Sequence, residues 1–222
     1  MKMRWCLLVS GFSTALVFSG ISASSQTVVT FDDLHETGSG SYFSYQYQGY
    51  QGLTWNNILC NNAILFTNVL PHEDSLFTNG LSGDYYGMVS ASNVVMLGVS
   101  LDGVSEIDSP ATNFNFLSAH LTGFVNSNLN IEVQGFNGAS LFYDQTVVAN
   151  ATNPTLFTFD YLNIDRLVFS GSGGEPAFVP TEEDSGFIMD NFTFEFIPEP
   201  SSLLLTSLGL ATLWAVAKRR RK

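Results

Sequence analysis

Acidic side chains are the most abundant source of chemistry in this chain. The 222 residues include 20 Asp and Glu but only 8 Lys and Arg, and seven of the eight basic residues lie within five residues of a terminus. Arg166 is the only basic residue between Gln26 and Pro200, so this segment has a formal net charge of −19. It lacks the Lys and Arg clusters that bind phosphates, which excludes a nucleic-acid-binding protein. Its carboxylates could bind a hard cation such as Ca²⁺, or act in pairs on a glycosidic bond.

Asp190 is the acidic residue whose environment the pattern constrains most. It lies just before the alternating segment Phe192–Phe196. If the alternation extends back to residue 190, the Asp190 carboxylate lies on the same face as the phenylalanines. A carboxylate that faces a core is costly unless it is paired, hydrogen-bonded or bound to a metal. The alternatives are a β-bulge that turns Asp190 to solvent and an Asx-turn.

Aromatic residues are concentrated between positions 42 and 55. Tyr45, Tyr47 and Tyr50 alternate there with Gln and Gly. Aromatic rings stack on the C–H faces of sugars while amides bind hydroxyl groups, so these three tyrosines are candidate glycan-binding residues. The alternative is that strand alternation buries about half of this aromatic set, and we expect Trp55 to belong to the core.

Catalytic signatures are few. His35, His72 and His120 are scattered, and zinc-protease and serine-hydrolase motifs are absent. Cys60 has no His or basic neighbour, so we expect a buried thiol without catalytic function. We expect Arg166 to pair with an acidic residue that the sequence does not identify. The chain is therefore predicted to have no enzymatic activity, and a glycoside-active hydrolase using paired carboxylates is the alternative.

The segment between Thr27 and Ile197 shows strand periodicity and no sustained helical periodicity. Alternation of apolar and polar residues is clearest in Leu129–Gln134, Phe157–Tyr161 and Phe192–Phe196. Further strands are expected at Thr27–Phe31, Ile64–Phe66, Asn93–Val99, from Phe114 and at Arg166–Phe169. Asn137-Gly138 predicts a hairpin turn. This pattern predicts an all-β domain, a two-sheet antiparallel sandwich.

The order of several segments resembles a jelly-roll domain of the galactose-binding or carbohydrate-binding type. The segments are FDDL from Phe31, YQGLTW from Tyr50, FNFLSAHLTG from Phe114, LNIEVQGFNG from Leu129 and FIMDNFTFE from Phe187. In such domains a calcium ion often ties the first strand to the last. The resemblance therefore implies a structural calcium site with Asp32 or Asp33 and Asp190 as ligands, and Asn191 as a further oxygen donor.

The N-terminus has the order of residues typical of a secretory signal peptide. Lys2 and Arg4 precede an apolar run from Trp5 to Phe18, and small residues follow as far as Ser25. The apolar run has about 14 residues and is shorter than the roughly 20 that cross a bilayer. We expect a signal peptide at residues 1–25, cleaved after Ser25.

The C-terminus combines three elements in order. Pro198, Glu199 and Pro200 precede 17 uncharged residues at 201–217, and a basic tail follows at 218–222. The uncharged segment predicts a transmembrane helix with its basic end in the cytoplasm. This arrangement resembles the PEP-CTERM sorting signal. The resemblance implies recognition by a membrane-embedded transpeptidase, an exosortase, which cuts near the triplet and releases the domain or attaches it to the cell surface or exopolysaccharide.

The expected organisation is a signal peptide at 1–25, a β-sandwich domain at 26–197 and a sorting signal at 198–222. We expect an exported protein, membrane-anchored before processing and then located at the cell surface or in the extracellular matrix. Its domain is expected to be a non-catalytic binding or structural module, with glycans as candidate ligands.

Overall fold

The computed structural model describes residues 25–34, 43–62, 86–91, 93–98, 103–178, 185–197 and 202–220. The strands before the long central hairpin are β1 (Thr27–Val29), β2 (Phe43–Tyr50), β3 (Leu53–Asn62), β4 (Asn93–Leu97), β5 (Val104–Asp108), β6 (Phe114–Gly123) and β7 (Asn126–Ser127). They are followed by β8 (Leu129–Asn137), β9 (Ser140–Ala149), β10 (Thr155–Ile164), β11 (Arg166–Ser172), β12 (Glu175–Pro176), β13 (Phe187–Phe196) and a helix, α2 (Ser202–Arg220).

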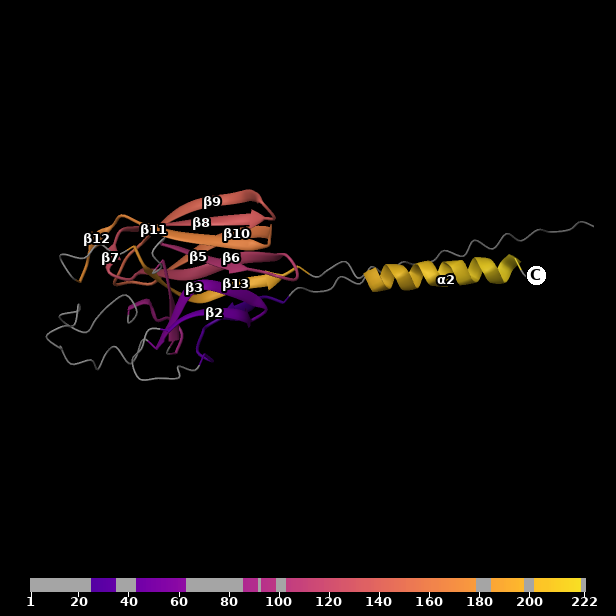
Figure 1. Ribbon diagram of the computed structural model, residues 1–222, viewed down its shortest axis with the longest axis horizontal. Helices are drawn as coiled ribbons and strands as arrows, with labels where there is room; N and C mark the ends of the chain where they lie inside the picture. Colours follow the sequence, from indigo (N-terminus) through magenta and orange to yellow (C-terminus); the bar gives the residue numbers. More distant parts are fainter. Residues whose placement is uncertain are drawn as a thin grey trace, which may run out of the picture.

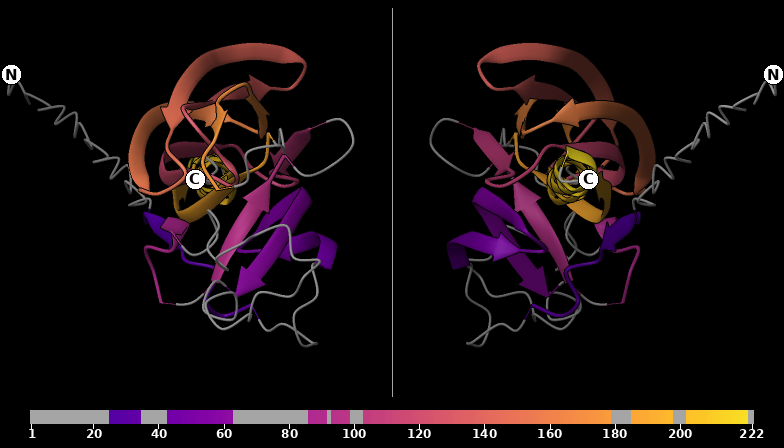
Figure 2. Two further views of the ribbon diagram at one scale, coloured as in Figure 1. Left: turned by 90° about the vertical axis from the view of Figure 1, so that its left-hand side faces the viewer. Right: turned by 90° about the vertical axis from the view of Figure 1, so that its right-hand side faces the viewer.

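The strands form an antiparallel sandwich that is close to a barrel, which confirms the predicted fold class (Figures 1 and 2). The order along the main sheet is β10-β6-β13-β4-β3-β5-β11-β8-β9, with β1 beside β13 and β2 beside β3. The sheet folds over so that its two ends meet, and the rings of Tyr143 on β9 and Tyr161 on β10 stack with centroids 4.5 Å apart. The two layers are thus parts of one hydrogen-bonded sheet.

Strand β3 forms the corner between the layers. Its first residues, Thr54 to Asn56, pair with β5, and its last residues, Leu59 to Asn62, pair with β4. Asn57 lies between these two stretches and has a φ of 56°, a left-handed conformation that Asn tolerates better than most residues. The strand can therefore change partners without ending.

The space between the layers is filled by apolar and aromatic side chains. Trp55, Phe116, Phe192 and Phe194 are at most 1% exposed, and Phe116 stacks on Phe192 with centroids 4.8 Å apart. Cys60 is also buried, at 2% exposure. The predicted core positions of Trp55 and Cys60 are therefore confirmed. Aromatic rings contribute large buried areas to such a core.

A second, smaller apolar cluster lies on the outer side of the layer formed by β4, β6 and β13. It contains Val94, Met96, Phe124, Val125 and Ile188, and Met88 packs against it. Met88 belongs to residues 86–91, which we call the strap because this segment crosses the outer face of β13 and β6. A Cβ atom added to Gly87 in the strap would lie 2.6 Å from Cγ2 of Ile188, so the two segments are in close contact.

The predicted hairpin between β8 and β9 is confirmed, with its turn shifted by one residue. Asn137 pairs with Ser140, so Gly138 and Ala139 form the turn, and Gly138 alone of the two has a positive φ, 58°. Glycine at the first central position is typical of a type II′ turn. Two hydrogen bonds fix this end: Gly138 N donates to Asp165 Oδ2 at 2.7 Å and Asn137 Nδ2 donates to the Asn163 carbonyl at 2.8 Å.

Helix α2 lies apart from the strands, in the region where a transmembrane helix at 201–217 is predicted (Figure 1). None of the helices in the described ranges is both long enough and apolar enough to span a bilayer. The predicted signal peptide, except Ser25, the triplet Pro198, Glu199 and Pro200, and the predicted strand at Ile64–Phe66 all lie outside the described residues.

Candidate functional site

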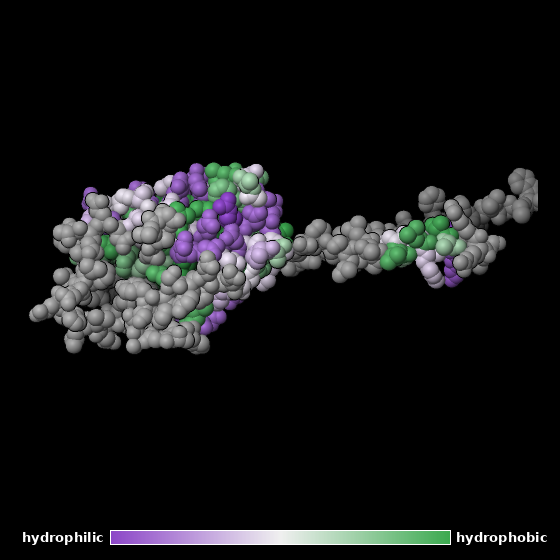
Figure 3. Space-filling model, viewed as in Figure 1, coloured by the Kyte–Doolittle hydropathy of each residue, from purple (hydrophilic) through white to green (hydrophobic). Residues whose placement is uncertain are grey.

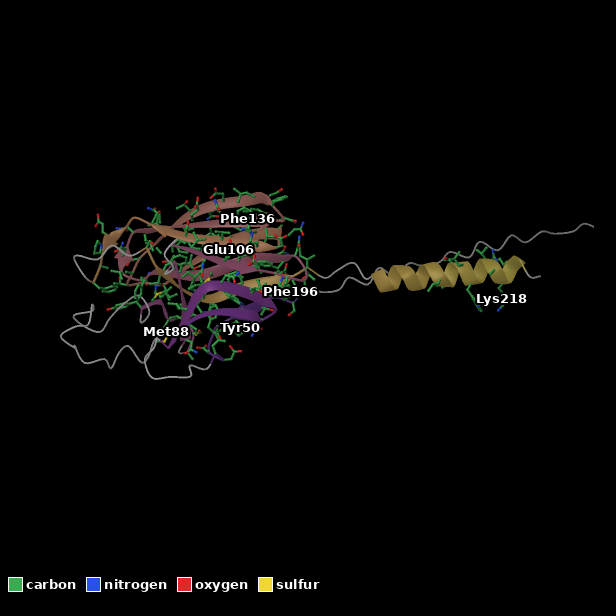
Figure 4. The ribbon with its side chains drawn as sticks, viewed as in Figure 1. Tyr50, Met88, Glu106, Phe136, Phe196 and Lys218 are labelled. Atoms are coloured by element: carbon green, nitrogen blue, oxygen red, sulfur yellow. The ribbon has the colours of Figure 1, made fainter. Side chains whose placement is uncertain are left out.

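Four neighbouring strands, β3, β5, β11 and β8, present a polar outer face. Leu167 and Phe169 on β11 are fully buried, so strand alternation directs Arg166 and Ser170 to the opposite, outer side. Backbone pairing places Arg166 directly between Asp108 on β5 and Phe136 on β8. We call the set of Asn56, Glu106, Asp108, Arg166 and Phe136 the Arg166 face. Glu106 and Phe136 are labelled in Figure 4.

Arg166 is held on this face by two interactions. Its Nη1 lies 3.2 Å from Oε1 of Glu106, and the side chains of the pair are 32% and 37% exposed. The guanidinium carbon lies 4.1 Å from the ring centroid of Phe136, a cation–π geometry. The prediction that Arg166 pairs with an acidic residue is confirmed, and its partner is Glu106.

Asp108 is the second carboxylate of the face, and its oxygen Oδ2 accepts a hydrogen bond of 2.9 Å from Nδ2 of Asn56. Burial raises the pKa of Asp108, and the negative charge of Glu106 raises it further. The Arg166 charge and the Asn56 hydrogen bond lower this pKa but do not cancel the increase. Glu106 and Asp108 thus have different environments although they lie on one strand.

The Arg166 face offers fixed hydrogen-bonding groups that remain accessible to solvent. A partly exposed ion pair of this kind contributes less than about 1 kcal/mol to folding. Its geometry is nevertheless constrained because Arg166 contacts both a carboxylate and a ring. Amide, carboxylate and guanidinium groups held next to one another offer both donors and acceptors to a hydroxyl-rich ligand.

Asp190 does not lie on the same face as the phenylalanines, so the prediction from strand parity is wrong. Asn191 has a φ of 51°, and the pairing of β13 with β6 shifts register between Asp190 and Thr193. This bulge reverses the alternation: Met189 and Phe192 point into the main core, while Ile188 belongs to the outer cluster. Asp190 shares the parity of Ile188 and lies under the strap.

The Asp190 carboxylate is completely buried and accepts hydrogen bonds on both oxygens. Oδ2 accepts from the backbone N–H groups of Val89 and Ser90, both at 2.7 Å, and Oδ1 accepts from the N–H of Asn191 at 2.6 Å. The Ser90 hydroxyl group lies 2.9 Å from Oδ1. Burial raises the pKa of Asp190, while the bonds from Ser90, Val89 and Asn191 act in the opposite direction.

The other two predicted ligands, Asp32 and Asp33, diverge. Asp32 accepts hydrogen bonds from the N–H groups of Ala91 and Asn93, at 3.3 and 3.0 Å, and so also holds the end of the strap. Asp33 accepts a hydrogen bond of 2.5 Å from the hydroxyl group of Tyr50.

The surroundings of these carboxylates do not resemble a calcium site. Backbone N–H groups and the Ser90 hydroxyl group donate hydrogen bonds to Asp190, and backbone N–H groups donate to Asp32; an N–H group is not a ligand for a cation. Asn191 contributes an N–H group, while its carbonyl oxygen accepts a hydrogen bond from Thr193. Among the described residues, no group of three or more His, Cys, Asp or Glu side chains could hold a metal ion. The hydrogen bonds alone account for the burial of Asp190.

The three candidate glycan-binding tyrosines lie on β2. In the backbone register, Tyr45 pairs with Ile58 and Tyr47 with Trp55, and their side chains lie outside the described part of the structure. Tyr50 packs against the main core, with its ring 6.1 Å from that of Trp55. Burial is the main cause that raises the pKa of Tyr50, followed by its hydrogen bond to Asp33. Tyr50 is therefore part of a structural contact between β2 and the segment after β1.

Sequence reasoning did not single out Asn56, Glu106, Asp108 or Phe136. Glu106 and Asp108 lie in a five-residue strand, and Asn56 is separated from Asp108 by 52 residues. The available signal was the isolation of Arg166 in an acidic segment, which required a carboxylate partner nearby. Identifying that partner depends on the register of β5 against β11.

No protein-family model matches the chain, and no curated protein sequence matches it significantly. A protein of the DUF4465 family from Bacteroides caccae is similar in structure, with a TM-score of 0.48 and 10% identity over 77% of this chain and 98% of that one. A DUF4465 protein from Bacteroides ovatus has a TM-score of 0.39 and 9% identity over 78% of this chain and 99% of that one. TmCBM61, solved with β-1,4-galactotriose, has a TM-score of 0.30 and 11% identity over 65% of this chain and 88% of that one. All three scores are below 0.5, so neither fold nor function is taken from them.

Proposed function

We propose that the chain is an exported glycan-binding module without catalytic activity, and that the Arg166 face is its binding surface. The observation that carries this proposal is the set of side chains on β3, β5, β11 and β8 that contact one another on the outer face. Arg166 is fixed by Glu106 at 3.2 Å and by the Phe136 ring at 4.1 Å, and Asn56 is fixed by Asp108 at 2.9 Å. The side chains of Arg166 and Glu106 are about one third exposed, so their remaining hydrogen-bonding capacity faces solvent.

A glycan suits this surface for two physical reasons. Its hydroxyl groups both donate and accept hydrogen bonds, which matches a face that mixes carboxylates with amide and guanidinium donors. The donors and acceptors are already ordered by their mutual contacts, so a ligand would not have to immobilise long flexible side chains. The segment from Gln26 to Pro200 has a net charge of −19, which favours neutral glycans over polyanionic ones.

A glycan array combined with a polysaccharide-hydrolysis assay tests this proposal on the fragment from Gln26 to Ile197, which contains every described strand. We expect binding without turnover, and loss of binding in Asp108→Asn. Glu195→Gln is the matched control, because Glu195 is also a carboxylate that accepts a bond from an asparagine, Asn115, at 2.7 Å, but it lies on β13. Binding that survives Asp108→Asn, or that is lost equally in Glu195→Gln, would contradict the proposed location.

The alternative function is a glycoside-active hydrolase, and one observation favours it. Glu106 and Asp108 are two residues apart on one strand and share a face, so their Cα atoms are about 6.6 Å apart. Asp108 has a raised pKa, while Glu106 is ion-paired with Arg166. Two carboxylates in different environments are the arrangement that glycosidases use for acid and base. Release of reducing sugar that disappears in both Asp108→Asn and Glu106→Gln would establish this alternative.

Export and sorting are a separate part of the proposal and depend on the two ends of the chain. The basic, apolar and small residues at 1–25 and the triplet Pro198, Glu199 and Pro200 before residues 201–222 support secretion, membrane anchoring and exosortase processing. A mutant that lacks the triplet should accumulate uncut in the membrane. If it is processed and exported like the wild type, the sorting proposal is wrong.

Calcium binding by Asp32, Asp33, Asp190 and Asn191 remains a hypothesis that is independent of glycan binding. A bound ion would replace the N–H donors that now contact Asp32 and Asp190. Melting curves in calcium and then in chelator test it. Equal melting temperatures in both would rule out a structural calcium ion.

A further inference from the structure

One end of the sandwich is the point where the chain leaves the domain toward α2. Ile197, the last described residue of the domain, donates its N–H to the Asn113 carbonyl at 3.0 Å. Asn113 Nδ2 donates in turn to Asn163 Oδ1 at 2.9 Å. Asn163 follows Leu162, whose N–H donates to the Tyr143 hydroxyl group at 3.1 Å. The exit of the chain, the β10–β11 turn and the β8–β9 hairpin therefore lie at the same end.

This end carries large apolar side chains that are open to solvent. Leu141 is 48% exposed, Phe142 is 63% exposed and Leu162 is 54% exposed. Hydrophobic side chains are visible on the surface over β9 in Figure 3. Leu141 and Phe142 directly precede Tyr143, whose hydroxyl group contacts the backbone of Leu162, so the three side chains come from adjoining segments. We call these three residues the exit patch.

The C-terminal helix begins a short distance after the exit. Five residue steps separate Ile197 from Ser202, which reach about 17 Å when fully extended. On α2, Leu210, Leu213, Trp214 and Val216 are all more than half exposed. Residues 201–217 carry no charge and the five basic residues 218–222 follow them. A segment of this composition partitions into or onto a lipid bilayer.

We propose that the exit patch contacts the lipid bilayer surface when the C-terminal segment is bound to the membrane. This inference depends on the membrane anchoring in the proposed function, and it adds an orientation for the domain. The short connection keeps the exit end within about 17 Å of the start of α2, so this end faces the bilayer. Leu141, Phe142 and Leu162 then enter the headgroup boundary, where apolar and aromatic side chains are stabilised.

A lipid surface fits this patch better than a second copy of the chain. Three side chains provide far less than the roughly 800 Å² per partner that a stable protein interface buries. Interfacial lipid contact has no such minimum area, because the helix supplies most of the binding free energy and the patch only sets the orientation. In the backbone register Leu141 pairs with Phe136 and Phe136 pairs with Arg166, so the Arg166 face begins next to the exit patch, at the same end of the sandwich.

Tryptophan quenching by brominated lipid tests the contact directly. The probe membrane is a vesicle of phosphatidylcholine with brominated acyl chains, and the chain runs from Gln26 to Lys222 with Trp214→Phe. Phe142→Trp reports on the exit patch. Leu156→Trp is the matched control. Leu156 lies on β10 and is 54% exposed, like Leu162 of the exit patch, but it pairs with His120 toward the other end of that strand. Trp55 is 1% exposed and supplies a constant background.

We expect strong quenching in Phe142→Trp and no quenching above background in Leu156→Trp. If the protein floats with the vesicles and the two variants are quenched equally or not at all, the orientation is wrong while the anchoring stands. If the protein does not float with the vesicles, both the anchoring and the orientation are wrong.

Discussion

Removal of the buried carboxylate of Asp190 should destabilise the domain strongly. Asp190 is 0% exposed and joins β13 to the strap, which lies about 100 residues earlier in the sequence. In Asp190→Ala the N–H groups of Val89, Ser90 and Asn191 lose their acceptor.

The magnitude follows from the number of donors that are left without a partner. Each buried unpaired N–H group costs about 1–3 kcal/mol, but the strap can move and admit water to Val89 and Ser90. We therefore expect a loss of about 3–5 kcal/mol in the free energy of unfolding, which is in the upper range for a single substitution. For a domain of this size the melting temperature should fall by roughly 10 °C or more.

Urea unfolding of the fragment from Gln26 to Ile197 at neutral pH measures this loss. Asp144→Ala is the control, because Asp144 is exposed and its contact with Gln134 is long, at 3.4 Å. Asp144→Ala should lower the free energy of unfolding by no more than about 0.5 kcal/mol. A cost below about 1 kcal/mol for Asp190→Ala, or equal costs for the two variants, would refute the assigned function of Asp190 in holding the strap.

Three further predictions concern other parts of the domain. Burial lowers the pKa of His120 more than the Asp190 charge raises it, so the unfolded state binds a proton more readily and the free energy of unfolding should fall as pH drops below about 6.5. In urea unfolding from pH 7 to pH 5, this free energy should fall less in His120→Gln than in the wild type. Arg166→Leu should change the free energy of unfolding by less than about 1 kcal/mol but abolish glycan binding, and a large loss of stability would contradict a functional assignment. Gly171→Ala would place a methyl group against the Ser185 carbonyl oxygen and should cost about 1–3 kcal/mol, whereas Gly209→Ala, in open space, should not destabilise the domain.

The alternating segments identified most of the strands because one of their faces is buried. In β8, Leu129, Ile131 and Val133 are fully buried and the intervening residues are not. The same reasoning failed for Asp190, where one residue, Asn191, adopts a left-handed conformation and reverses the faces. A bulge changes parity without altering the apolar pattern that precedes or follows it, so alternation alone does not reveal it.

The candidate site was harder to predict, because it depends on strand register and not on local pattern. The isolation of Arg166 indicated an acidic partner, but Glu106 is 60 residues away in the sequence. Phe136 contacts Arg166 through the pairing of β8 with β11. The local contact of Asp33, an expected calcium ligand, depends on register as well: the β2–β3 hairpin brings Tyr50 close, and its hydroxyl group donates a hydrogen bond to Asp33.

The central claim is that a glycan binds to the Arg166 face, and a chemical-shift map of the fragment from Gln26 to Ile197 tests it most directly. Titration with a glycan identified on the array should shift the side-chain signals of Asn56 and Arg166 and the backbone signals of Glu106 and Asp108. These residues are joined by contacts of 2.9 and 3.2 Å, so they should respond together. Shifts confined to β2 around Tyr50, or no shifts on β3, β5 and β11, would contradict the claim.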